Sequence, residues 1–253
     1  MKDPESGTIS RTDGERIAYL KRSGSAPGIV WLGGFKSEMT ATKATALDAW
    51  AARHDHAYVR FDYFGHGGSS GTFRNGTITR WRDDALAVLD KLTSGPQILV
   101  GSSMGAWLAL LVALARPERT VGLLLIAPAT DFTEALLWNR LDSDARRDIL
   151  DKGEWLRPSL YDPIPYPITR ILIEDGRKHL LLDGVIVLHC PVRIVQGLAD
   201  PDVPYEHAMK LVAVLGPDTQ ITLVKNGDHR LSKPHEIELI EGVLSNLITG
   251  RHA

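Results

Sequence analysis

Ser103 stands at the centre of a Gly101-Ser-Ser-Met-Gly105 stretch, which has the G-x-S-x-G pattern of an activated serine. The stretch follows the apolar run Gln97–Val100 and continues directly into Met104–Ala115, whose spacing is that of a helix. A sharp turn between a strand and a helix lifts a serine hydroxyl clear of a sheet, and glycines remove side chains that would collide in such a turn. The pattern therefore predicts that Ser103 is a nucleophile for acyl transfer.

A serine nucleophile needs a base and an acid, and both follow Ser103 along the chain in the order acid, then histidine. Asp200 comes just after the apolar run Val192–Val195, and His229 follows a second run that ends at Val224. Loops at the carboxyl ends of parallel strands carry the ligands of an α/β sheet. We therefore expect Asp200 to orient His229, with Asp202 as the less favoured acid, since it could equally begin the next helix or lie on the surface.

Two backbone N–H groups are expected to stabilise the oxyanion that forms during acyl transfer. The residue after the nucleophile, Met104, supplies one, and the loop that begins with Gly33 and Gly34 supplies the other, for which we choose Phe35. His66 also follows a strand and could approach this site, but its glycine neighbours indicate first a tight turn.

The elements that must position these residues alternate between short apolar runs and longer segments of helical spacing, which predicts an α/β fold. An antiparallel hairpin is expected at the start, followed by six buried strands in a mostly parallel sheet of about eight strands, with helices on both faces. The expected strands are Gly7–Arg11, Arg16–Lys21, Ile29–Leu32, Ala57–Phe61, Gln97–Val100, Val121–Ile126, Val192–Val195 and Gln220–Val224. The expected helices are Thr42–Arg53, Thr79–Leu92, Met104–Ala115, Tyr205–Leu215 and His235–Leu247.

Residues 131–188 do not continue this alternation, because polar helix-like pieces meet a proline-rich stretch there. We predict a lid inserted into a hydrolase-type core made of residues 1–130 and 189–253. Apolar residues of the insertion would either accept an acyl chain or attach the lid to the core. Those residues are Leu136, Leu137, Trp138, Trp155 and Ile164.

Composition narrows the class of protein further. The chain has 253 residues, 43% of them hydrophobic, and a formal net charge of −2, which argues against a nucleic-acid partner. A single cysteine, Cys190, cannot form an internal disulfide or a zinc site alone, so we expect a reducing compartment, a packing role for this thiol, and neither a metal nor an organic cofactor. The first ten residues lack a leader pattern and the apolar stretches are too short to span a bilayer, so we expect a cytoplasmic location and no membrane span.

With these motifs in place, the chain resembles the α/β-hydrolase superfamily. The resemblance rests on the order of five stretches: Trp31–Phe35, Phe61–Ser69, Gly101–Gly105, Gly197–Asp200 and Gly227–His229. More narrowly, Leu99–Leu108 and Asp228–Arg230 are similar to the branch of palmitoyl-protein thioesterases and acyl-glucuronide esterases. The resemblance implies hydrolysis of acyl thioesters or esters, with Ser103 as nucleophile, Asp200 as acid and His229 as base.

We therefore expect a serine hydrolase that cleaves carboxylic esters or thioesters of small molecules or acylated proteins through an acyl-enzyme. Peptidase, lactonase and C–C hydrolase reactions use the same residues on this fold and stay open as alternatives. A ligand-binding protein with an idle triad is the alternative from another class. The oligomeric state is not predicted from the sequence.

Overall fold

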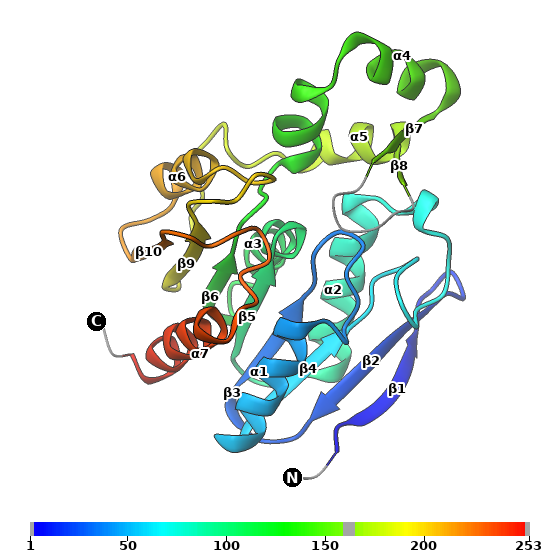
Figure 1. Cartoon of the computed structure of the whole chain (residues 1–253). Helices are drawn as coiled ribbons and strands as arrows, with labels where there is room; N and C mark the ends of the chain where they lie inside the picture. Colours follow the sequence, from blue (N-terminus) through cyan, green and yellow to red (C-terminus); the bar gives the residue numbers. More distant parts are fainter. Residues whose placement is uncertain (1–2, 159–164, 251–253) are drawn as a thin grey trace.

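A computed structural model describes residues 3–158 and 165–250 (Figure 1). Its centre is an eight-stranded sheet in the order β1-β2-β4-β3-β5-β6-β9-β10. β1 and β2 form an antiparallel hairpin, β2 pairs antiparallel with β4, and the remaining neighbours are parallel. The strands are β1 (Glu5–Ser10), β2 (Arg16–Arg22), β3 (Ser25–Leu32), β4 (His56–Phe61), β5 (Gln97–Ser102), β6 (Thr120–Ile126), β9 (Val192–Gly197) and β10 (Thr219–Val224). The predicted α/β class and mostly parallel sheet are confirmed.

Helices cover both faces of this sheet (Figure 1). They are α1 (Thr42–Arg53), α2 (Ile78–Leu92), α3 (Met104–Ala115), α6 (Tyr205–Val214) and α7 (Pro234–Thr249), with a single 3₁₀ turn, η1 (Phe73–Asn75), before α2. The alternation of side chains along β3 divides the core in two. Ile29 and Trp31 pack in the cluster with α1 and α7, whereas Val30 and Leu32 pack in the larger cluster with α2 and α3.

The parallel register brings strand ends together at one edge of the sheet. Leu32 at the end of β3 lies opposite Gly101 of β5, so the loop after β3 starts beside the turn after β5. Val224 at the end of β10 lies opposite Gly197 at the end of β9, so the loops after these strands are neighbours as well. The segments in which we expected functional residues therefore share one edge.

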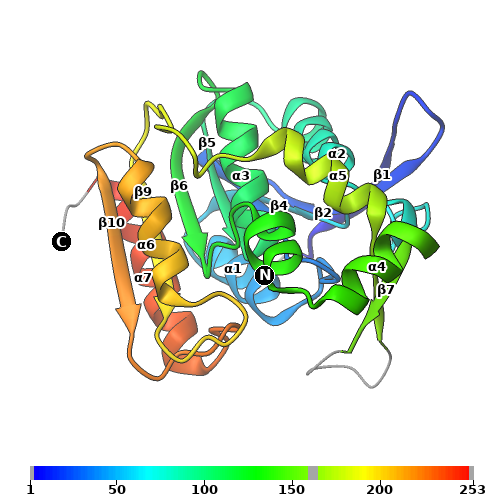
Figure 2. The ribbon, with the colours of Figure 1, turned by 90° about the horizontal axis from the view of Figure 1, so that it is seen from above.

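The described residues of the segment 131–188, which are 131–158 and 165–188, form a separate group of short elements that lies above the sheet in Figure 1 and is seen from above in Figure 2. It contains the π-helical turn η2 (Thr133–Leu137), the 3₁₀ turns η3 (Trp138–Arg140) and η4 (Arg177–His179), the helices α4 (Ser143–Lys152) and α5 (Arg170–Gly176), and the strands β7 (Glu154–Arg157) and β8 (Tyr166–Thr169). β7 and β8 pair antiparallel in a sheet of their own, which we did not predict. The division into a core and a lid stays a prediction.

Polar contacts attach this group to the helices beneath it. The Asp175 carboxylate accepts hydrogen bonds from the Thr79 backbone N–H at 2.7 Å and its hydroxyl at 2.8 Å, at the start of α2. The indole N–H of Trp107, on α3, donates to the His179 carbonyl at 3.1 Å. These three bonds are partly shielded from water, so they hold the segment in a defined position over the sheet.

The five apolar residues of the insertion, which we expected either to accept an acyl chain or to attach the lid to the core, differ in their burial. Leu136 and Leu137 are buried, and Trp138 and Trp155 are half-buried and pack against the larger core cluster. Ile164 lies outside the described residues. Among the described residues, no helix is long and apolar enough to cross a membrane.

Candidate active site

Ser103 occupies a strained turn between β5 and α3. Its φ of 55° and ψ of −120° lie in a region that non-glycine residues rarely adopt, which is typical of residues held for function. A side chain at Gly105 would collide with the Leu32 carbonyl oxygen, and one at Gly101 would collide with the backbone of Gly105. Both glycines of the motif are thus required by close backbone approach. The Ser103 N–H is anchored to the Ile126 carbonyl at 2.9 Å.

The structure brings the three residues expected to form a triad into one hydrogen-bonded chain. His229 Nε2 lies 3.0 Å from Ser103 Oγ, and His229 Nδ1 lies 2.8 Å from Asp200 Oδ2. Since a carboxylate only accepts, Nδ1 carries the proton and donates it, which leaves Nε2 to accept the serine O–H. The Asp200 side chain is fully buried and that of His229 is 17% exposed. This arrangement has the geometry of an activated nucleophile.

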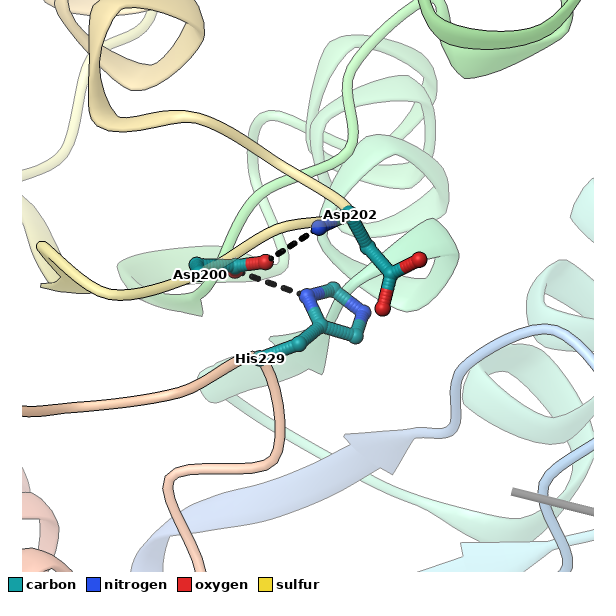
Figure 3. A group of neighbouring side chains, drawn as sticks. All are labelled: Asp200, Asp202 and His229. Atoms are coloured by element: carbon teal, nitrogen blue, oxygen red, sulfur yellow. Dashed lines mark hydrogen bonds and ion pairs between the residues drawn. The ribbon is translucent and has the colours of Figure 1, made fainter. Parts of the chain in front are cut away.

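Asp202, the less favoured acid, has a different position. Asp200 Oδ1 accepts the backbone N–H groups of Asp202 at 2.9 Å and Val203 at 2.8 Å, which orients the Asp200 carboxylate toward His229. The Asp202 carboxylate lies on the opposite side of the imidazole from Asp200 (Figure 3) and is 3.6 Å from the Arg157 guanidinium. The geometry therefore favours Asp200 over Asp202 as the partner of Nδ1.

The same three side chains, Asp200, Asp202 and His229, could in principle ligate a metal ion, because their ligand atoms lie within 4.8 Å of one another. His229 Nδ1 and Asp200 Oδ2, however, are already joined in a hydrogen bond, and Asp200 Oδ1 accepts two backbone N–H groups. We therefore interpret the cluster as a hydrogen-bonded support for the imidazole.

Phe35 and Met104, whose N–H groups we expect to bind the oxyanion, both line the pocket that contains Ser103 and His229. A Cβ atom at Gly34 would stand 3.4 Å from the Ser103 Cβ, so the loop after β3 lies directly against the nucleophile. Outside helices and strands, no backbone hydrogen bond of the described residues uses either N–H group. Both residues thus line the pocket beside the nucleophile, and their role as oxyanion donors stays a prediction.

His66 supports the loop after β3 through a hydrogen bond with its backbone. Its Nδ1 lies 3.1 Å from the Phe64 carbonyl and therefore donates to it, which leaves Nε2 to accept the backbone N–H of Lys36 at 3.2 Å. The ring is buried, and burial lowers its pKa below the ordinary value, which favours the neutral form that this pattern requires. Our expectation of a tight turn missed this contact, because His66 and Lys36 are thirty residues apart in the chain.

The pocket around Ser103 has a volume of about 630 Å³. Its inner wall is apolar and buried, and consists of Met104, Ala129, Phe132, Leu136, Leu137, Ile168 and Val203. Trp138 is not among the described lining residues. Its ring faces the guanidinium groups of Arg146 at 5.5 Å and Arg177 at 5.0 Å, both within the insertion, so these contacts join elements of the insertion to one another.

Cys190 lies elsewhere, beside a smaller pocket that shares no residue with the one around Ser103. Its side chain is half-buried and packs against the larger core cluster. Burial raises the pKa of the thiol to about 11, so it is protonated at neutral pH and a poor nucleophile.

The sheet order, the strained serine turn and the hydrogen-bonded Ser, His and Asp are features of the α/β hydrolases. The profile of the alpha/beta hydrolase family matches residues 26–238, and the chain belongs to this family. The mitochondrial palmitoyl-protein thioesterase ABHD10 of Homo sapiens is 38% identical over 242 residues, which cover 95% of this chain and 79% of the human protein. The resemblance noted from the sequence is thereby confirmed.

Solved structures agree with this assignment. A protein from Agrobacterium vitis S4 superposes with a TM-score of 0.94 at 43% identity, over 98% of this chain and 100% of its own. Alpha/beta hydrolase domain-containing protein 10 from mouse superposes with a TM-score of 0.90 at 35% identity, again over 98% of this chain and all of the other.

Proposed function

We propose that this protein is a serine hydrolase that cleaves carboxylic esters and thioesters through an acyl-enzyme. The observation that carries the proposal is the continuous chain from Ser103 Oγ to His229 and on to the buried carboxylate of Asp200, with bonds of 3.0 and 2.8 Å. An imidazole at that distance from a hydroxyl, held by a carboxylate that cannot reach water, is suited to act as a general base.

In the first half of the reaction, His229 Nε2 accepts the proton of Ser103 Oγ while the oxygen attacks the carbonyl carbon of the substrate. The negative charge of the tetrahedral intermediate is held by the N–H groups of Phe35 and Met104. His229 then donates the proton to the leaving oxygen or sulfur, and the carbon–heteroatom bond breaks. An acyl ester on Ser103 remains.

In the second half, a water molecule gives a proton to His229 Nε2 and its oxygen attacks the acyl carbon. Collapse of the second tetrahedral intermediate breaks the bond to Ser103 Oγ, which takes its proton back from His229, and the carboxylic acid leaves. Asp200 keeps the proton on Nδ1 and stabilises the imidazolium that forms twice per cycle.

Similarity to the human palmitoyl-protein thioesterase supports thioesters among the substrates. The apolar inner wall of the pocket supports a substrate whose acyl chain binds there, next to the carbonyl group at Ser103. The human relative is named as mitochondrial, whereas a cytoplasmic location is our own proposal for this chain. Peptidase, lactonase and C–C hydrolase chemistry are not favoured by any particular contact of the described residues.

Covalent labelling with a fluorophosphonate distinguishes a hydrolase from a binding protein on the same fold. We expect wild type to gain one adduct on Ser103, and Ser103→Ala to gain none. Ser102→Ala is the matched control, because it removes the neighbouring hydroxyl, and it should still be labelled. A folded wild-type protein that is not labelled would rule out the proposed function.

A series of thioesters and oxyesters with the same acyl chains then identifies the substrate class. We expect kcat/KM to rise with chain length, because each buried methylene adds about 0.8 kcal/mol of favourable transfer free energy. A kcat/KM that falls with chain length would contradict the assignment of the apolar wall to the acyl group.

A further inference from the structure

The pocket changes character from its inner wall to its rim. The inner residues, among them Met104 and Ile168, are fully buried and apolar. The rim includes Lys36 and Arg140, whose side chains are exposed to solvent. A substrate whose carbonyl sits at Ser103 would therefore place an apolar acyl group inside and its leaving group toward the rim.

The rim is strongly basic although the whole chain is slightly acidic. Five basic side chains and one acidic side chain line the pocket, whereas the chain as a whole has a formal net charge of −2. The lining charges are Lys36, Lys43, Arg140, Arg157, Arg230 and Asp202. Like charges gathered in a cleft with apolar walls focus the field on the space between them, which attracts an anion.

Lys36 and Arg157 are the two cations of this basic rim that approach one aromatic ring. Both cations approach the ring of Tyr166, with the Lys36 Nζ at 5.3 Å and the Arg157 guanidinium at 5.9 Å from its centre. They come from distant parts of the chain, Lys36 from the loop after β3 and Arg157 from the end of β7. Asp202 lies 3.6 Å from Arg157 and balances part of its charge.

Lys36 and Arg140 differ from Arg157 in this respect. No ion pair joins either residue to a carboxylate within the part of the chain that the structure describes. Lys36 also follows Phe35 directly, so its charge stands one residue from a proposed oxyanion donor. The positive charges of Lys36 and Arg157 lie near the same ring and repel each other, Asp202 offsets only part of this repulsion, and a bound anion would offset more of it.

We infer that Lys36, Arg157 and Tyr166 bind an anionic group, carboxylate or phosphate, on the leaving group of the substrate. The inference rests on the proposed function and deepens it: the substrates are esters or thioesters of an apolar acid with a negatively charged alcohol or thiol. The two cations supply charge-assisted hydrogen bonds, and both approach the ring of Tyr166, whose face attracts positive charge.

Three thioesters that share one acyl chain but differ in the thiol test the inference. The first thiol is N-acetylcysteamine, which is neutral; the second is 3-mercaptopropionate, which carries a carboxylate; the third is coenzyme A, which carries phosphates. We expect kcat/KM for an anionic thioester to exceed that for the neutral one by about tenfold at low ionic strength, and the ratio to shrink as salt screens the charges. The favoured anion identifies its source. Equal kcat/KM values for all three would overturn the inference.

Substitutions in the basic rim test whether Lys36 and Arg157 cause the preference for anionic thioesters. In the Lys36→Met/Arg157→Met double variant, the ratio of anionic to neutral kcat/KM should fall about tenfold. Lys210→Met is the matched control, because it removes one exposed positive charge on α6, outside the pocket, and should retain the wild-type ratio. A ratio that survives in the double variant would also overturn the inference.

A binding measurement separates the inference from the proposed function. Ser103→Ala should bind free coenzyme A or 3-mercaptopropionate with a Kd below about 1 mM, and adding the two rim substitutions should weaken this binding about tenfold. Such binding without any hydrolysis by wild type would support the anion site and refute the proposed function. Ser103-dependent hydrolysis of the neutral thioester, with no binding of either anion, would refute the anion site and support the proposed function.

Discussion

The ammonium group of Lys43, on α1, donates a hydrogen bond to the backbone carbonyl of Arg230, the residue that follows His229. The bond ties the loop that carries the imidazole to a helix on the face of the sheet. Burial lowers the pKa of Lys43 to about 8, although the carboxylates of Asp228 and Glu236 act in the opposite direction. The bond is therefore charge-assisted at neutral pH and loses that assistance in mild alkali.

Replacing Lys43 by methionine should lower kcat/KM by about tenfold at pH 7, because a charge-assisted hydrogen bond that positions the His229 loop is lost. In wild type, kcat/KM should decline above about pH 8 as Lys43 loses its proton, and Lys43→Met should lack this decline. Lys43→Arg keeps the charge at high pH and serves as control. Superimposable pH profiles for wild type and Lys43→Met would contradict a positioning role.

His66 is expected to act through the loop that it supports. His66→Ala removes the acceptor of the Lys36 N–H and should lower kcat about tenfold with little change in KM, because the Phe35 donor is used most in the transition state. His66→Gln offers a carbonyl oxygen in place of Nε2 and should recover most of the rate. If alanine and glutamine variants are equally slow, the ring matters for packing and not as an acceptor.

Much of this architecture could be predicted because its signals are local. β6 ends in a continuous run of buried aliphatic residues, Leu123–Ile126, and α1 begins and ends at the residues that helical spacing indicates. The approach of Ser103, Asp200 and His229 followed from a general property of parallel sheets, whose carboxyl ends meet at one edge. Each of these inferences needed only a short stretch of sequence and a rule about its surroundings.

The rest depends on contacts between distant segments. β7 and β8 are four residues each, and Pro167 interrupts the second, so neither has a recognisable strand pattern before the two are paired. The basic rim combines Lys36 with Arg157, and no spacing rule joins residues so far apart. His66 was singled out in the sequence, but its acceptor role was visible only once the loop after β3 was in place.

Asp200 and Asp202 should differ sharply in their effects on rate. Asp200→Asn removes the carboxylate that accepts from Nδ1 and favours the wrong tautomer, so kcat should fall by about 10³- to 10⁴-fold. Asp202→Asn keeps the backbone N–H that orients Asp200, and we expect a loss of no more than about tenfold. Steady-state kinetics on one thioester compares both variants, and a larger loss for Asp202→Asn would exchange their assigned roles.

The free energy of unfolding should depend on pH through Asp131, at the start of the insertion. Its buried carboxylate accepts the backbone N–H groups of Leu181 at 3.0 Å and Leu182 at 2.9 Å, yet burial raises its pKa from 3.8 to about 6. The folded protein therefore holds this proton more tightly than the unfolded chain does. The resulting stability is fully present below about pH 4 and is lost as the pH rises through about 6.

Asp131→Asn carries no titratable group at this position, so it should gain stability relative to wild type between about pH 4 and pH 7. The gain should approach about 3 kcal/mol in the free energy of unfolding at pH 7, because the pKa is raised from 3.8 to about 6 and one pKa unit corresponds to about 1.4 kcal/mol. Urea unfolding of both proteins across this range measures the difference. A difference that stays constant with pH would mean that Asp131 titrates alike in the folded and unfolded chains, and that its two backbone hydrogen bonds offset the whole cost of burying its charge.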